Sequence, residues 1–239
     1  MKNILVITDN VYLLQQFRTL IKRLNLNVRF EFKSSPGRVD NSLMAVHELS
    51  HIKLKEEWQN VAQNYDIVIS IHCKQIFPAE MTRAVKCINV HAGLNPYNRG
   101  WFPQVFSIIN GLPWGVTIHE IDEELDHGDI IIQEQMELNA WDTSSSAYKR
   151  VLDKEIELME KVLVKIVEGN YSAIKMPIEG NVNLKKDFKE LCVIDLNEKV
   201  TMKEAIDRLR ALSFSGYDNA FFHDSYGNKV YISVNLKKE

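Results

Sequence analysis

Along the first part of the chain, segments with strand-like apolar patterns alternate with segments in which apolar residues have helical spacing. Lys2 to Thr8 is mostly apolar, which is typical of a strand buried on both faces, and Val11 to Leu24 has apolar residues at helical spacing. Residues 27–32 alternate between polar and apolar, which predicts a second strand. A helix over Leu54 to Asn64 and a strand over Tyr65 to His72 follow. Strands that alternate with helices predict an α/β protein with a mostly parallel, twisted sheet.

Shorter strands and a long helix follow in the middle of the chain. A short helix near residues 78–85 leads into a strand from Cys87 to His91. Two further apolar strands are predicted at Gly115 to Asp122 and Asp129 to Leu138, with a polar turn between them. Thr143 to Gly169 has the pattern of one amphipathic helix, with threonine as the N-cap and glycine as the C-cap.

The pattern weakens after the long helix. Tyr171 to Leu196 shows no periodicity and is predicted to be a connector. Thr201 and Glu204 form a capping-box pattern that opens a helix. Ala220 to His223 and Lys229 to Val234 flank a polar turn, which predicts a β-hairpin.

Length and composition limit the classes of protein that remain. The 239 residues suffice for one large domain with an appendage, so we expect a Rossmann-like domain over residues 1–180 and a small helix-plus-hairpin region over residues 181–239. A net charge of -3 gives no electrostatic reason to expect a nucleic-acid or membrane partner. No apolar run approaches the roughly 18 residues of a membrane span. Cys73, Cys87 and Cys192 form no CxxC pair, which fits a reducing cytoplasm.

Polar side chains lie where predicted strands end. Ligands of open α/β sheets bind at the carboxyl ends of strands, where His72, Asn89 and His91 are expected. Asn89 and His91 are two residues apart, so both side chains project from one face of their strand. An amide can donate to an oxyanion, and an imidazole can accept a proton from a nucleophile. Spacing alone fits a polar strand end with satisfied hydrogen bonds equally well.

A second polar group lies in the turn that contains Asp126, His127 and Gly128. A carboxylate there can reach a histidine on a neighbouring strand, raise its pKa and orient its ring. Aspartate and glycine are common in turns, so the turn is informative only in combination with the strand motif. Adjacent turn residues rarely bind one ion together, so we expect no metal at His91, Asp126 and His127.

The two motifs together resemble the formyltetrahydrofolate-dependent formyltransferase family, which includes purine-pathway, methionyl-tRNA and sugar N-formyltransferases. The family pattern is Asn-x-His-x-x-x-x-Pro, a histidine on the next strand, and Asp-x-Gly-x-Ile. The matching positions are Asn89, His91, Pro96, His119, Asp126, Gly128 and Ile130. The likeness extends over roughly residues 1 to 170. It implies formyl transfer from N10-formyltetrahydrofolate to an amine, without a metal.

By this resemblance, the catalytic residues are Asn89, His91 and Asp126. His91 is expected to accept a proton or, when protonated, to stabilise the tetrahedral oxyanion. Asn89 is expected to donate a hydrogen bond to that oxyanion, while Asp126 supports His91 and relays protons. His119 lies inside a predicted strand and is expected to be structural.

The resemblance also implies that two loops bind the folate through main-chain groups, which suit the edge of a pterin ring. Their residues are Cys73, Lys74, Gln75, Ile76, Phe77, Ile121, Asp122 and Leu125. Lys74 has two interpretations, because it follows the end of a strand. It is either a solvated loop lysine or a contact for a diphosphate.

The tail distinguishes among family members. Residues 170–239 hold nine Lys and two Arg against ten Asp and Glu, a net of +1 (11 − 10), which does not suit an RNA-binding surface. Residues 98–107, residues 72–78 and the short tail resemble the sugar N-formyltransferases, in particular those that act on dTDP-4-amino-4,6-dideoxyglucose for surface polysaccharide (O-antigen) synthesis. The alternatives are a glycinamide ribonucleotide-type or methionyl-tRNA formyltransferase, and a catalytically silent nucleotide-binding module.

The expected contacts to the nucleotide sugar combine polar side chains with flat aromatic faces that stack on a base. They are Asp9, Asn10, Lys74, Trp101, Phe102, Gln104, Tyr217, Phe221 and Phe222. For any single aromatic residue, packing in the core is the alternative. The hairpin carries more apolar side chains than an exposed ribbon needs, which predicts a homodimer formed through it.

Overall fold

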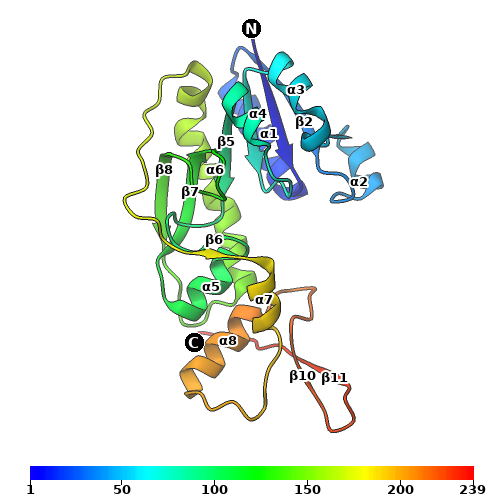
Figure 1. Cartoon of the computed structure of the whole chain (residues 1–239), viewed down its shortest axis with the longest axis vertical. Helices are drawn as coiled ribbons and strands as arrows, with labels where there is room; N and C mark the ends of the chain where they lie inside the picture. Colours follow the sequence, from blue (N-terminus) through cyan, green and yellow to red (C-terminus); the bar gives the residue numbers. More distant parts are fainter.

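The computed structural model describes every residue from Met1 to Glu239. The molecule is elongated, with the N-terminal sheet at one end and the C-terminal hairpin at the other (Figure 1). None of its helices combines the length and the apolar character that crossing a membrane requires.

A seven-stranded sheet in the order β3-β2-β1-β4-β5-β7-β8 forms the main body. Its strands are β1 (Lys2–Thr8), β2 (Val28–Ser34), β3 (Ser50–His51), β4 (Ile67–Ile71), β5 (Lys86–His91), β7 (Trp114–Glu120) and β8 (Ile130–Met136). The first five strands in this order are parallel, whereas β7 runs antiparallel to both β5 and β8. The predicted mostly parallel α/β sheet is therefore confirmed.

Helices cover both faces of this sheet (Figure 1). One face packs against α1 (Val11–Leu24) and α6 (Ser144–Glu168), and the other against α3 (Leu54–Asn64) and α4 (Ala79–Ala84). In β1, Ile4 and Val6 belong to the first core, and Leu5 and Ile7 to the second. Strand residues alternate between faces, so a strand covered on both sides is apolar at nearly every position.

The predicted capping residues lie at the beginning and the end of their helices. Thr143 accepts a hydrogen bond from the Ser146 backbone N–H at the start of α6, and Gly169 ends that helix at a left-handed φ of 75°. Thr201 and Glu204 form the predicted capping box of α8 (Met202–Leu212). These boundaries depend on neighbouring residues only, so local sequence suffices to place them.

The prediction of a plain connector over residues 171–196 is wrong. This segment contains β9 (Val182–Asn183) and α7 (Lys185–Leu191). β9 pairs in parallel with β6 (Arg99–Gly100), which lies far earlier in the chain. A strand of two residues has no periodicity to detect, and its partner cannot be inferred from local sequence.

Two further helices and a two-stranded hairpin complete the chain. They are α2 (Asn41–Val46), α5 (Pro103–Asn110) and the predicted hairpin of β10 (Ala220–His223) and β11 (Lys229–Ile232). Val105 and Ile108 of α5 form a third core with Ala211 and Leu212 of α8. The C-terminal region is therefore attached to the sheet domain mainly through α5.

Candidate active site

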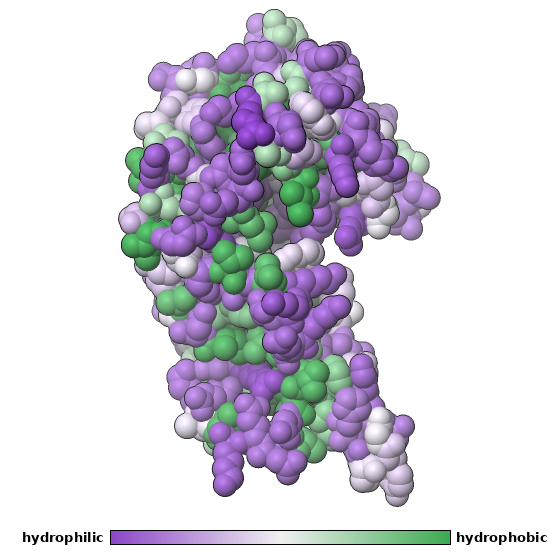
Figure 2. Space-filling view, viewed as in Figure 1, coloured by the Kyte–Doolittle hydropathy of each residue, from purple (hydrophilic) through white to green (hydrophobic).

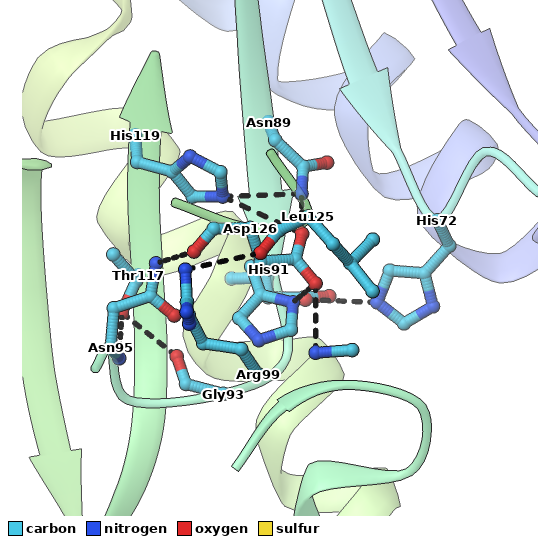
Figure 3. Close-up of polar contacts among 12 residues, drawn as sticks. His72, Asn89, His91, Gly93, Asn95, Arg99, Thr117, His119, Leu125 and Asp126 are labelled. Carbon is cyan, nitrogen blue, oxygen red and sulfur yellow. Dashed lines mark hydrogen bonds and ion pairs between the residues drawn. The ribbon is translucent and has the colours of Figure 1, made fainter. Parts of the chain in front are cut away.

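The structure brings the motif residues together at the ends of β5 and β7 (Figure 3). Nδ2 of Asn89 lies 3.0 Å from Oδ1 of Asp126 and donates a hydrogen bond to it. Nδ1 of His91 lies 3.6 Å from Oδ2 of the same carboxylate. Asp126 comes from the turn before β8 and adopts a left-handed φ of 48°, which directs its side chain back toward β5.

His119 also belongs to this cluster, although its position inside a strand suggested a structural role only. The pairing of β5 with β7 places it directly opposite Asn89. Its Nδ1 lies 2.6 Å from the Glu120 backbone oxygen, which can only accept, so Nδ1 carries the proton. In the neutral form of the ring, Nε2 then accepts from the Asn89 amide, at 3.3 Å. Both N–H groups of Asn89 are thus engaged, one by His119 and one by Asp126.

Burial determines the protonation of His91. Its side chain is 7% exposed, and its Nε2 has no hydrogen-bond partner within the chain. Burial lowers the pKa of His91 to about 4, against the opposing effect of the Asp126 carboxylate. The sequence-based expectation of a raised pKa is wrong, because the cost of burying an imidazolium outweighs the attraction. His91 is therefore neutral near pH 7 and can accept a proton.

Asp126 is held as a carboxylate. Burial raises its pKa, but His91, His119 and the Gly100 backbone N–H outweigh this effect and bring the pKa below its ordinary value. The Gly100 N–H donates to Oδ2 over 3.0 Å. With Asn89 on the other oxygen, each carboxylate oxygen receives one hydrogen bond.

Two side chains hold the backbone of the turn that carries Asp126. The Asn95 amide donates to the Asp126 backbone oxygen over 2.8 Å, and the Arg99 guanidinium lies 3.4 Å from the Leu125 backbone oxygen. Gly93 leaves room for the imidazole ring of His91, because a Cβ there would stand 2.3 Å from Nε2 of that ring. The loop after β5 therefore needs a glycine at position 93.

A second buried polar cluster lies beside the trio at the end of β4. Nε2 of His72 is 2.9 Å from Oε1 of Glu155, a fully buried carboxyl group on α6. Nδ1 of His72 is 3.0 Å from the Tyr148 hydroxyl, to which Asn10 also donates. Burial raises the pKa of Glu155. Strand-end position indicated His72 in advance, whereas its partners on α6 carry no local signal.

The predicted folate loop after β4 is anchored by its own side chains. Asp9 accepts hydrogen bonds from the backbone N–H groups of Ser35 and Lys74, at 2.7 and 2.8 Å. The Gln75 side chain accepts from the Leu54 N–H and donates to the Ile52 oxygen. Asp9 and Gln75 thus hold loops in place, and their polar atoms face the protein.

The other predicted folate-loop side chains divide between core and surface. Phe77 is buried in the second core, together with the half-buried Cys73 and Ile121. Burial raises the pKa of the Cys73 thiol to about 11. Ile76 is 87% exposed and Leu125 is 45% exposed. These two are the apolar side chains that the loops offer to a ligand.

Asp122 contacts the histidine that follows Asp126 in the sequence. Its Oδ2 lies 2.6 Å from Nδ1 of His127, and its Oδ1 accepts from the Glu124 N–H. Glu124, His127 and Glu179 carry ligand atoms within 4.8 Å of one another at the surface. His127 lies next to Asp126 in sequence but belongs to this surface group and not to the trio.

Trp101 links the sheet domain to the C-terminal region. Nζ of Lys74 lies 5.4 Å from the centre of its indole ring, and Nζ of Lys185, from α7, lies 5.2 Å from it. Burial lowers the pKa of Lys74. Two cations beside one aromatic ring form a surface suited to a base and its phosphates.

The remaining predicted substrate residues occupy three different environments. Phe102 packs on Phe188 of α7 with ring centres 4.2 Å apart, and Gln104 is buried and donates to Ser144. Tyr217 is exposed and packs beside Phe214, whose ring contacts Tyr148. Phe221 and Phe222 lie on β10, where the Phe221 ring contacts Tyr231 across the hairpin. No contact links these two residues to the trio.

The surface is hollowed between the sheet and the C-terminal region, with apolar side chains along its border (Figure 2). A family model described as "Formyl transferase" matches residues 34–163, more than half of the chain. The chain belongs to the formyl transferase family. A second model, "N-formyltransferase dimerization C-terminal domain", matches residues 187–238 of this formyltransferase.

Individual relatives agree with this assignment. A dTDP-4-amino-4,6-dideoxyglucose formyltransferase of Mycobacterium tuberculosis is 50% identical over 184 residues, which cover 77% of this formyltransferase and 79% of the relative. The crystal structure of a 4-N formyltransferase from Francisella tularensis is 45% identical and superposes with a TM-score of 0.95, covering 100% of this chain and 99% of the other. A sugar N-formyltransferase from a Shewanella species is 39% identical, with a TM-score of 0.96 over 100% and 99% of the two chains.

Proposed function

We propose that this formyltransferase moves the formyl group of N10-formyltetrahydrofolate onto the amine of a dTDP-linked amino-dideoxy sugar, with dTDP-4-amino-4,6-dideoxyglucose as the acceptor. The observation that carries the proposal is the hydrogen-bonded cluster of Asn89, His91 and Asp126 in a chain of this family. The choice of sugar is supported by 50% identity to an enzyme named for that sugar.

His91 is the proposed proton acceptor. The sugar amine attacks the formyl carbon, so that a C–N bond forms and the carbonyl becomes a tetrahedral oxyanion. The neutral imidazole of His91 takes one amine proton, and its lowered pKa keeps it in this form near pH 7. Collapse of the intermediate breaks the bond to N10 of the folate, and the same proton passes to that nitrogen. The formamide and tetrahydrofolate are then complete without a further reactant.

Asn89 and Asp126 are proposed to support this transfer. The Asn89 N–H that faces His119 forms the longer of its two bonds, at 3.3 Å against 3.0 Å, so it is the one that can turn to the oxyanion. Asp126 stabilises the imidazolium form of His91 that exists between the two proton steps.

Two surfaces beside the trio are proposed to bind the substrates. The loops of residues 73–77 and 121–125 would hold the folate, with Ile76 and Leu125 supplying apolar contact to the pterin ring. Trp101 would stack on the base, with Lys74 and Lys185 near the diphosphate.

We divide the chain into a catalytic domain over residues 1–180 and a C-terminal region over residues 181–239 that dimerises and contributes to nucleotide-sugar binding. The match of a dimerization domain to residues 187–238 supports the dimer. Tyr231 on β11 is an exposed side chain that a partner would cover. Free thiols at all three cysteines support a cytoplasmic location, and the product would enter surface polysaccharide (O-antigen) synthesis.

A panel of acceptors tests the proposal. The protein is incubated with N10-formyltetrahydrofolate and, separately, with dTDP-4-amino-4,6-dideoxyglucose, its 3-amino isomer, glycinamide ribonucleotide or methionyl-tRNA. Mass spectrometry should show the gain of one formyl group on the 4-amino sugar. If another acceptor is formylated faster, that acceptor is the substrate in place of the 4-amino sugar. If none of the four acceptors is formylated, the proposed activity is wrong.

A further inference from the structure

The segment between the two family matches, residues 164–186, contains β9, which pairs with β6 in the chain after β5. Its residues 179–183, which we call the strap, run alongside residues 96–101. The Asn181 backbone oxygen accepts from the Arg99 N–H at 3.0 Å, and the Asn183 oxygen accepts from the Trp101 N–H at 2.9 Å. The Asn181 N–H reaches the Pro96 oxygen at 3.3 Å.

Three successive N–H groups divide between the strap and Asp126. Gly100 has a left-handed φ of 89°, so the backbone turns at this residue. Arg99 and Trp101 direct their N–H groups to the strap, whereas the intervening Gly100 directs its N–H to Oδ2 of Asp126 at 3.0 Å. This three-residue segment therefore connects the strap to the Asp126 carboxylate.

Side chains lock the strap against this loop. Asn98 is fully buried, and its Oδ1 accepts from the amides of Asn181 and Asn183 at 2.8 and 3.1 Å. The Asn98 backbone N–H in turn donates to Oδ1 of Asn181 at 2.9 Å. Buried amides that satisfy one another in this way hold a single arrangement.

The backbones also approach too closely to allow other residues. A Cβ on Gly180 would stand 1.9 Å from the Pro96 oxygen, and a Cβ on Gly100 would stand 2.5 Å from the Asn183 oxygen. Glu179 pairs with the buried Arg99 guanidinium at 2.5 Å, and that guanidinium also reaches the Leu125 oxygen beside Asp126. The Glu179–Arg99 pair therefore connects the strap to the backbone beside Asp126.

We propose that residues 179–183 are a positioning strap for the reaction: they take the N–H groups on either side of Gly100 and thereby hold its own N–H on the Asp126 carboxylate. The strap acts through Asp126. This inference rests on the proposed role of Asp126 in formyl transfer.

Gly180→Ala tests the strap, because the new methyl group collides with Pro96 and lifts the strap from the loop. We expect kcat for dTDP-4-amino-4,6-dideoxyglucose to fall at least about tenfold, with the KM of N10-formyltetrahydrofolate within about twofold. Hydrogen exchange of the Gly100 amide should accelerate at least about tenfold, while core amides such as that of Val116 keep their rates. The matched control is Gly111→Ala, which has nearly the same φ (70° against 69°) but no atom within 4 Å of the added methyl.

Asn181→Ala serves as a second variant, because it removes two bonds to Asn98 and adds no bulk; exposed Asn197→Ala is its control. If the hydrogen-exchange rate of the Gly100 amide and kcat are unchanged in both strap variants, the proposed role of the strap is wrong. An equal loss in Gly111→Ala, or a loss confined to KM, would lead to the same conclusion. Failure of the proposed function gives a different result. In that case the unmodified protein formylates no acceptor, while the hydrogen-exchange rate of the Gly100 amide still increases in Gly180→Ala.

Discussion

Asn89 and Asp126 lie 37 residues apart in the chain, and a hydrogen bond of 3.0 Å joins Nδ2 of the first to Oδ1 of the second. The amide thereby fixes one carboxylate oxygen and leaves the other facing His91. A carboxylate held in this way cannot rotate away from the imidazole without breaking a hydrogen bond between buried groups. This relationship underlies the first two predictions.

His91→Asn and Asp126→Asn should each lower kcat at least about a hundredfold, because each removes a participant in proton transfer. Steady-state formylation of the 4-amino sugar measures the effect, and circular dichroism checks that both variants fold. His127→Asn is the control, since His127 follows Asp126 directly but pairs with Asp122. Near-unchanged turnover in either trio variant would reject the assigned mechanism.

His119→Phe should lower kcat by about tenfold, because the Asn89 amide loses the acceptor that orients it. A tenfold change corresponds to about 1.4 kcal/mol, which is the contribution of one hydrogen bond. The KM values should change little. His47→Phe, at a surface site, is the comparison. If His119→Phe lowers the melting temperature and leaves kcat intact, this histidine is structural, as its strand position suggested.

The buried His91 should make folding stability depend on pH. Its pKa is about 4 in the folded protein and 6.5 ordinarily, so between these values the unfolded chain binds a proton that the folded chain does not. Stability should therefore fall as the pH falls through this window, by about 2 kcal/mol from pH 7 to pH 5. Urea unfolding of the wild type and His91→Asn at both pH values isolates the contribution. An identical pH dependence in the two proteins would show that His91 titrates normally.

Trp101→Ala should weaken the binding of dTDP at least about tenfold, because the base loses a stacking surface that contributes about 1–3 kcal/mol. Isothermal titration calorimetry measures this without turnover. Trp141→Ala is the matched control, since Trp141 is also partly exposed and also lies beside a lysine, Lys238. Equal affinity of the Trp101 variant and the wild type would place the base elsewhere.

Tyr231→Asp should dissociate the proposed dimer, because it places a charge on the exposed apolar face of β11. Sedimentation at micromolar concentration should give twice 27.7 kDa for the wild type and 27.7 kDa for the variant. Tyr226→Asp, at the tip of the hairpin, is the control and should leave the mass unchanged. Sedimentation of the unmodified protein at 27.7 kDa would reject the proposed dimer.

Local patterning by itself was enough to determine most elements and the motif residues. The bounds predicted for β1, α1 and α3 match the structure residue for residue, because apolar spacing and flanking polar residues define them. Asn89 and His91 share a face because strand geometry alone requires it. These features depend on residues that are neighbours in sequence.

Only the tertiary structure decided which distant groups meet. The register of β5 with β7 sets His119 opposite Asn89, and a shift of one residue would have turned it away. The pKa of His91 depends on how completely the surrounding chain excludes water, so the motif suggested the wrong direction of shift. The strap at residues 179–183 has no local pattern, because its structure comes from hydrogen bonds to a loop about eighty residues earlier, which form only when the chain has folded.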